Sequence, residues 1–278
     1  MAQTTTLDEL IGKFEALLFD SDGVLARWPG VVPGAPKAID QLNSLNKPYF
    51  VLTNDASALP ETRSARYREL GLDIDADRII TAGSLLTAHF SELGIAGSRC
   101  VVLGTEDSAD YVRAAGGEVV SFEDDFDVLV IGDQLGFSFL EATGTVLTNV
   151  FRKIDRDETP YLVLPNPDVI YPEGGGFGFA SGAVALMFEA AMALRYPARK
   201  DLVFSRLGKP HPAMFEEAFR RSGTRDAVMI GDTPGTDIRG ANHVGIASVL
   251  MGTGVAISDP SKLPETDRPT YLMASLIP

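Results

Sequence analysis

The stretch ALLFDSDG at residues 16–23 joins a short apolar run to two carboxylates. A continuous apolar run of this length is typical of a strand buried on both faces of a parallel sheet. Asp20 and Asp22 follow the run, so we expect them at the carboxyl end of the strand, where open parallel sheets bind ligands. Such a pair can supply a nucleophile and a proton donor or acceptor, and Gly23 permits a sharp turn. An ordinary turn or a calcium loop is the alternative.

Apolar runs that end in polar residues recur along the chain. Residues 49–52 and 227–230 form two of them, and each is followed by hydroxyl or carboxylate side chains. Between such runs, residues 36–45 and 60–70 show helical spacing or charged helical composition. This alternation predicts an α/β fold with a parallel sheet. A second series of the same kind runs from residue 100 to residue 194.

The domain organisation follows from two breaks in this pattern, at residues 94–98 and 196–201. We predict a catalytic core formed by residues 1–98 and 200–278, interrupted by a second α/β domain at residues 99–199. A length of 278 residues agrees with two domains, at roughly 150 residues per domain.

Two further clusters carry groups that suit phosphate. The hydroxyl of Thr53 and the backbone amides around Asn54 can hold phosphate oxygens, although a helix cap or an Asx turn also explains this pair. Lys209 stands between Gly208 and Pro210 on a restrained backbone, so its ammonium can be aimed at a phosphoryl group. The alternative for Lys209 is an ordinary surface lysine.

The last cluster is GDTPGTD at residues 231–237. The preceding strand delivers Asp232 to the sheet edge, so Asp20 and Asp232 can bind one Mg²⁺, which prefers a few carboxylates with water and substrate phosphate. We expect Asp237 to orient Lys209 or a metal-bound water. A solvated acidic turn is the alternative.

The composition excludes several classes of protein. Twenty-four basic and 38 acidic residues give a net charge of −14, which disfavours nucleic acid polymers and anionic membranes as partners. A single cysteine excludes an intrachain disulfide framework and a multi-cysteine zinc site. The first six residues lack the features of a signal peptide, and no apolar run is long enough to span a bilayer. We therefore expect a cytoplasmic protein.

In their order along the chain, the motifs at Asp20–Gly23, Thr53, Lys209 and Gly231–Asp237 resemble those of the haloacid dehalogenase superfamily. The resemblance covers nearly the whole chain and implies a Rossmann-like core with an inserted C2-type cap. The segment from Asn166 to Asp168 and the Gly-Lys-Pro sequence around Lys209 look like the class IIA branch, which is NagD-like or p-nitrophenyl-phosphatase-like.

The resemblance implies specific catalytic roles. Asp20 would attack phosphorus and form an aspartyl-phosphate, while Asp22 would protonate the leaving oxygen and then activate water. The Asp20 carboxylate, the Asp22 carbonyl and Asp232 would bind Mg²⁺. These roles predict a Mg²⁺-dependent phosphomonoesterase for a small phosphorylated metabolite.

The resemblance also implies how substrate is held. Thr53, Asn54 and Lys209 would bind the phosphoryl group, and Asp168 and Tyr171 of the cap would contact the leaving group. The branch often forms homodimers through its cap, so we expect a homodimer. A phosphotransferase on the same scaffold and a phosphometabolite-binding protein without turnover remain as alternatives, although a binding protein has little need of Asp22.

Overall fold

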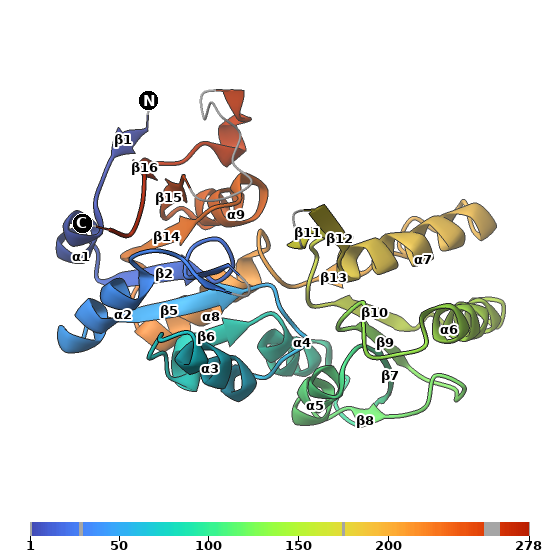
Figure 1. The fold of residues 1–278 in the computed structure, drawn as a ribbon. Coiled ribbons are helices and arrows are strands. Elements are labelled where there is room, and N and C mark those ends of the chain that lie inside the picture. The colour runs from blue at the N-terminus through green and yellow to red at the C-terminus, as the bar shows by residue number, and fades with distance from the viewer. Residues whose placement is uncertain (1, 28–29, 174–175, 253–261, 278) are drawn as a thin grey trace. The chain divides into compact units, whose positions relative to one another are not determined.

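The computed structural model describes residues 2–27, 30–173, 176–252 and 262–277. These residues build two compact units, each with its own sheet (Figure 1). The first unit comprises Met1–Thr53, Pro60–Ile80 and Lys209–Pro278, and the second comprises Asn54–Leu59 and Thr81–Gly208.

The second unit differs in extent from the predicted insert. It spans residues 81–208 instead of 99–199, and it includes residues 54–59. Helix α4 (Leu86–Leu93) belongs to this unit because it contacts α5 (Glu106–Ala114). The glycine after α4 ends the helix in the left-handed conformation. The break in the sequence pattern there therefore marks the end of a helix and not the start of the unit.

The sheet of the first unit has seven strands in the described part of the chain. In sheet order they are β1 (Gln3–Thr4), β16 (Tyr271–Met273), β15 (Ala247–Met251), β14 (Ala227–Gly231), β2 (Ala16–Asp20), β5 (Tyr49–Thr53) and β6 (Ile79–Thr81). The pairs from β1 to β5 in this order are parallel. β2, β5 and β14 contain the apolar runs that predicted them.

Helices and short turns surround this sheet. They are α1 (Leu7–Lys13), α2 (Ala35–Ser44), α3 (Pro60–Glu69), α8 (Pro212–Ser222), α9 (Arg239–Val244), η1 (Ala76–Arg78), η3 (Pro234–Ile238) and η5 (Glu265–Asp267). A small antiparallel pair, β3 (Ala26–Arg27) with β4 (Gly30–Val31), follows β2. Alternate strand residues such as Leu17 and Phe19 belong to one buried hydrophobic core with Leu10, Ile39 and Tyr67 of α1, α2 and α3. Burying such a side chain contributes about 1.5–3 kcal/mol.

The second unit has a five-stranded sheet in which every pair is parallel. In sheet order its strands are β13 (Ser205–Arg206), β10 (Tyr161–Leu164), β9 (Val128–Ile131), β7 (Arg99–Leu103) and β8 (Glu118–Val119). Its other elements are η2 (Gly83–Leu85), α6 (Phe139–Ile154), α7 (Ser181–Arg195) and the antiparallel pair of β11 (Ile170–Glu173) and β12 (Gly176–Phe179).

The predicted fold class is confirmed: a Rossmann-like parallel-sheet core carries an inserted α/β unit. Each sheet has strands that are buried at nearly every position, as the continuous apolar runs required. Among the described residues, no helix combines the length and the apolar character needed to cross a membrane.

Candidate active site at the carboxyl end of the first sheet

The carboxyl ends of β2, β5 and β14 lie side by side in the first unit. The register pairs Asp20 with Leu52, the residue before Thr53, and β14 pairs with β2 on the other side. Asp232 follows β14 directly, and it is buried like Thr53. The parallel register therefore brings side chains from distant parts of the chain to one edge, as the sequence predicted.

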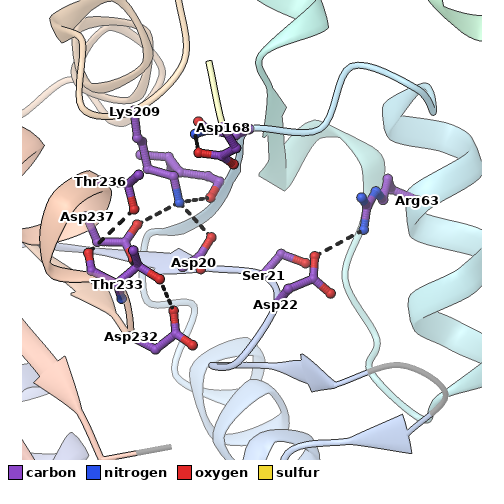
Figure 2. Close-up of polar contacts among 12 residues, drawn as sticks. Asp20, Ser21, Asp22, Arg63, Asp168, Lys209, Asp232, Thr233, Thr236 and Asp237 are labelled. Atoms are coloured by element: carbon purple, nitrogen blue, oxygen red, sulfur yellow. Dashed lines mark hydrogen bonds and ion pairs between the residues drawn. The ribbon is translucent and has the colours of Figure 1, made fainter. Parts of the chain in front are cut away.

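Lys209 is the centre of this edge (Figure 2). Its ammonium nitrogen donates to Asp20 Oδ1 at 2.6 Å, to Asp237 Oδ1 at 2.7 Å and to the carbonyl of Leu52 at 2.8 Å. Its side chain is only 2% exposed. Burial by itself lowers the pKa of Lys209, but the charges of Asp20 and Asp237 outweigh it and raise that pKa. Lys209 is therefore a fixed cation.

Asp237 owes its position to the loop after β14. It lies in the π-helical turn η3, where its Oδ2 accepts a hydrogen bond from the backbone N–H of Thr233 at 3.1 Å. A Cβ on Gly231 would lie 2.2 Å from the Cβ of Asp237, so no larger residue fits at position 231. Burial raises the pKa of Asp237, the charge of Asp20 adds to this, and Lys209 opposes it. Asp237 thus contacts Lys209, which is one of the two partners expected for it.

Three carboxylates gather here around one ammonium. Asp20, Asp232 and Asp237 each offer an oxygen within 4.8 Å of the others. Burial raises the pKa of Asp232 to about 7, and the charge of Asp20 adds to the rise. Three carboxylates against the single charge of Lys209 leave negative charge uncompensated, and oxygen ligands are those that Mg²⁺ prefers. The residues therefore fit a divalent cation.

The absence of a side chain at Gly23 leaves room for the carboxylate of Asp232. A Cβ on Gly23 would lie 1.8 Å from Asp232 Oδ2, and Gly23 has a left-handed φ of +91°. Only glycine satisfies both requirements, because other residues rarely adopt this φ and would collide with the carboxylate. The glycine of the first motif thus sets where the carboxylate of the last motif lies.

Asp22 stands apart from the carboxylate cluster. Its side chain is 63% exposed and turns toward Arg63 of α3, with 3.9 Å between Oδ2 and Nη1 (Figure 2). The neighbouring Ser21 is buried, and its hydroxyl forms a 2.6 Å hydrogen bond with the hydroxyl of Tyr67. The turn is therefore anchored at Ser21 while the carboxylate of Asp22 is exposed to solvent.

The remaining predicted site residues lie in the second unit. Asn54 donates from Nδ2 to Asp168 Oδ1 at 2.9 Å, so these two predicted residues are in contact. Tyr171 lies across the β11–β12 pair against Gly178, where a Cβ would be 2.6 Å from the tyrosine ring. Asp55 accepts hydrogen bonds from the backbone N–H and the hydroxyl of Ser57, at 3.0 Å and 2.6 Å.

Comparison with known proteins agrees with this geometry. Residues 17–118 match the model of the haloacid dehalogenase-like hydrolase family, and residues 206–277 match a second HAD hydrolase-like model. The dihydroxyacetone phosphatase of Corynebacterium glutamicum is 30% identical over 93% of this chain and 88% of its own length. The chain belongs to the haloacid dehalogenase-like hydrolases.

Solved structures of other proteins share its fold. A possible sugar phosphatase from Cytophaga hutchinsonii has a TM-score of 0.84 and 30% identity, covering 100% of this chain and 99% of that one. A glycerol phosphate phosphatase from Mycobacterium tuberculosis, solved in complex with magnesium, has a TM-score of 0.82 and 26% identity, covering 96% and 77%. The resemblance drawn from the motifs is confirmed, and the names agree with the prediction of a phosphatase.

Arg63 is the residue at the edge of this hydrolase site that the sequence analysis missed. It lies in the first turn of α3 and its side chain is 17% exposed. Arg66 and Arg68 follow on the same helix and are exposed. Helical spacing does not distinguish the three arginines by function, so the sequence carried no signal for the contact with Asp22.

We expect Gly23→Ala to weaken Mg²⁺ binding by this hydrolase by roughly 10–100-fold, the usual effect of displacing a group that supports a metal ligand. The new methyl group would push the carboxylate of Asp232 away and would strain the left-handed backbone. Calorimetric Mg²⁺ titration of the purified protein measures this. Gly12→Ala in α1 is the matched control, because a Cβ there meets nothing within 4 Å. Equal Mg²⁺ affinity in the two variants would contradict the claim that Gly23 sets the position of Asp232 for Mg²⁺ binding.

Proposed function

We propose that this hydrolase is a Mg²⁺-dependent phosphomonoesterase that works through an aspartyl-phosphate on Asp20. The observation that carries the proposal is the position of Lys209, which holds Asp20 and Asp237 at 2.6 Å and 2.7 Å beside Asp232. A buried cation among several carboxylates suits a site in which a phosphoryl group is bound and transferred.

Asp20 is the proposed nucleophile. Lys209 and the register of β2 orient its carboxylate, and orientation is a large part of what in-line phosphoryl transfer requires. One oxygen of Asp20 forms a bond to phosphorus while the bond from phosphorus to the ester oxygen breaks. The product is an acyl phosphate on Asp20 and a free alcohol.

Asp22 is the proposed general acid and base. In the first step its carboxyl group gives a proton to the departing ester oxygen. In the second step its carboxylate takes a proton from the water that attacks the phosphorus of the aspartyl-phosphate, which releases inorganic phosphate and restores both aspartates. The exposure of Asp22 leaves it accessible to the alcohol and to water.

Thr53, Asn54 and Lys209 are the proposed phosphate-binding groups, and Asp20, the Asp22 carbonyl and Asp232 are the proposed Mg²⁺ ligands. The uncompensated negative charge of the carboxylate cluster supports the metal assignment. The chemistry that Mg²⁺ supplies is neutralisation of the phosphoryl oxygens. Lys209 would add a fixed positive charge beside the phosphoryl group.

The proposed substrate class is the phosphate ester of a small polyol or sugar. Supporting relatives are the dihydroxyacetone phosphatase, a D-glycerol 3-phosphate phosphatase of Mycobacterium tuberculosis that is 30% identical over 93% of this chain, and acid sugar phosphatases of staphylococci. The net charge of −14 disfavours polyanionic substrates, while Lys209 together with a bound Mg²⁺ would compensate the charge of a single phosphate.

Removing the metal should abolish activity. Protein treated with EDTA should hydrolyse p-nitrophenyl phosphate, dihydroxyacetone phosphate and glycerol 3-phosphate at less than about 1% of the Mg²⁺-loaded rate, because the phosphate charge is then uncompensated. Release of inorganic phosphate measures this, and readdition of Mg²⁺ should restore the rate. Undiminished hydrolysis in EDTA would contradict the proposal.

The same assay separates a phosphatase from a phosphotransferase. For a phosphatase, nitrophenol and inorganic phosphate appear in equal amounts, and added glycerol leaves that ratio unchanged. A deficit of inorganic phosphate that grows with glycerol concentration would show transfer to the alcohol instead of to water.

A further inference from the structure

Helix α5 of the second unit has a buried face that is polar. Ser108 and Tyr111 are 1% and 5% exposed, and they lie one helical turn apart. Thr105 is the N-cap of the same helix, one turn earlier. A buried helix face is ordinarily apolar, because burying a hydroxyl without a partner costs free energy. The three hydroxyls therefore need partners.

Those partners are consecutive carbonyls of residues 54–59. Ser108 Oγ donates to the carbonyl of Ala56 at 2.8 Å, Thr105 Oγ1 to that of Ser57 at 2.7 Å, and the Tyr111 hydroxyl to that of Ala58 at 2.7 Å. Thr105, Ser108 and Tyr111 thus bond to three consecutive residues of the segment, although not in the order of those residues. The segment is thus held along its length by one helix.

Further contacts tie both ends of the segment to the second unit. The N–H of Leu59 donates to Asp107 Oδ2 at 2.9 Å, and the side chain of Asn54 bonds to Asp168. Gly83 makes room for Tyr111, since a Cβ there would lie 2.4 Å from the ring. These bonds explain why residues 54–59 belong to the second unit although both flanking segments belong to the first.

Chain connectivity gives this attachment a consequence for the proposed active site. Thr53 ends β5 in the first unit, and the next residue, Asn54, is held by the second unit. Thr53 and Asn54, two of the three proposed phosphate-binding residues, are therefore joined by one peptide bond yet held by different units. Whatever fixes residues 54–59 also fixes the backbone N–H and side chain of Asn54.

We propose that Tyr111 and Ser108 are positioning residues for phosphate binding, because they hold the segment that carries Asn54. The inference rests on the proposed phosphatase function. Neither hydroxyl is assigned a contact with the substrate or the metal. They act by fixing the backbone next to Thr53, so that the phosphoryl group meets an ordered binding loop.

The test is a comparison of Tyr111→Phe and Ser108→Ala with the wild-type enzyme. Each variant removes one hydroxyl and keeps most of the packing. The Tyr111 hydroxyl also bonds to the Thr81 hydroxyl at 2.6 Å and the Ser108 hydroxyl to that of Thr105 at 3.1 Å, so each variant loses a second bond as well. Each should raise the KM for p-nitrophenyl phosphate and the inhibition constant of inorganic phosphate together, by roughly fivefold, the effect of losing the hydrogen bond to the segment. We expect kcat and the half-saturating Mg²⁺ concentration to change less than about twofold, because the groups concerned lie in the first unit.

Tyr196→Phe is the matched control. The Tyr196 hydroxyl bonds to Asp155 at 2.8 Å and to the carbonyl of Phe151 at 3.1 Å, in the same unit but on other elements. This variant should keep the wild-type KM and inhibition constant even if it unfolds at a lower temperature.

Hydrogen bonds that serve stability alone would give a different result. Tyr111→Phe and Ser108→Ala would then lower the unfolding temperature while KM and the phosphate inhibition constant stayed at wild-type values, and this would overturn the proposal. A fall in kcat without a change in KM would also overturn it. If one variant fails to fold, the other decides. Absence of Mg²⁺-dependent hydrolysis in the wild-type protein would instead refute the proposed function.

Discussion

Asp20→Asn should lower kcat for p-nitrophenyl phosphate by at least about 10⁴-fold, a loss of the size seen when a catalytic nucleophile is removed. An amide oxygen is a much poorer nucleophile than a carboxylate, and Asp237, which is also bonded to Lys209, is fully buried. Phosphate release at saturating substrate and Mg²⁺ measures the loss. The circular dichroism spectrum should match that of the wild type, because Lys209 keeps Asp237 as its partner.

Asp40→Asn is the matched control for this substitution. Asp40 is an exposed carboxylate on α2 of the same unit, so its variant makes the same chemical change away from the site. Its activity should equal that of the wild type. Residual Mg²⁺-dependent activity above about 1% in folded Asp20→Asn would contradict the assignment of the nucleophile.

Lys209→Met should abolish activity and also destabilise the fold. It removes the cation that neutralises Asp237, which is 0% exposed, and Asp20, which is 15% exposed. Removing one partner of a buried ion pair costs about 3–5 kcal/mol of unfolding free energy, because the other charge stays buried without compensation. Urea unfolding in EDTA, followed by circular dichroism, measures this cost for the metal-free protein.

Two further variants test the electrostatic origin of that loss. Lys209→Met combined with Asp237→Leu removes both members of the pair, so it should recover part of the stability while activity stays absent. Lys37→Met removes an exposed lysine from α2 and should unfold at the wild-type urea concentration. If Lys209→Met and Lys37→Met unfolded at the same urea concentration, the buried pair would not support the fold.

Much of this edge could be predicted because a buried parallel strand has a recognisable sequence. The apolar runs before Asp20 and Asp232 can be buried only inside a sheet, so the first polar residue after each run has to lie at the sheet edge. The motif order then predicted which residues would meet. The contact of Asp237 with Lys209 was one of the two expected for it, whereas the bond from Lys209 to Asp20 was not predicted.

The limits of the second unit were less predictable for a specific reason. Residues 94–98 look like a boundary because a glycine-ended helix and a domain linker have the same local composition. Helix α4 joins the second unit through its contact with α5. The spacing of apolar residues in a helix does not show which other helix it will contact. The prediction therefore placed the junction at residue 99 and not at residue 81.

The sequence alone determines the buried central strands, the order of the motifs and the residues at the ends of those strands, because these depend on local periodicity and burial. The attachment of residues 54–59 to α5 and the meeting of Arg63 with Asp22 arise from the tertiary fold. They join residues 41 to 53 positions apart, through single hydroxyl–carbonyl and ion-pair contacts that leave no repeating pattern in the chain. Packing of whole elements creates such contacts, so they become visible only once those elements are assembled.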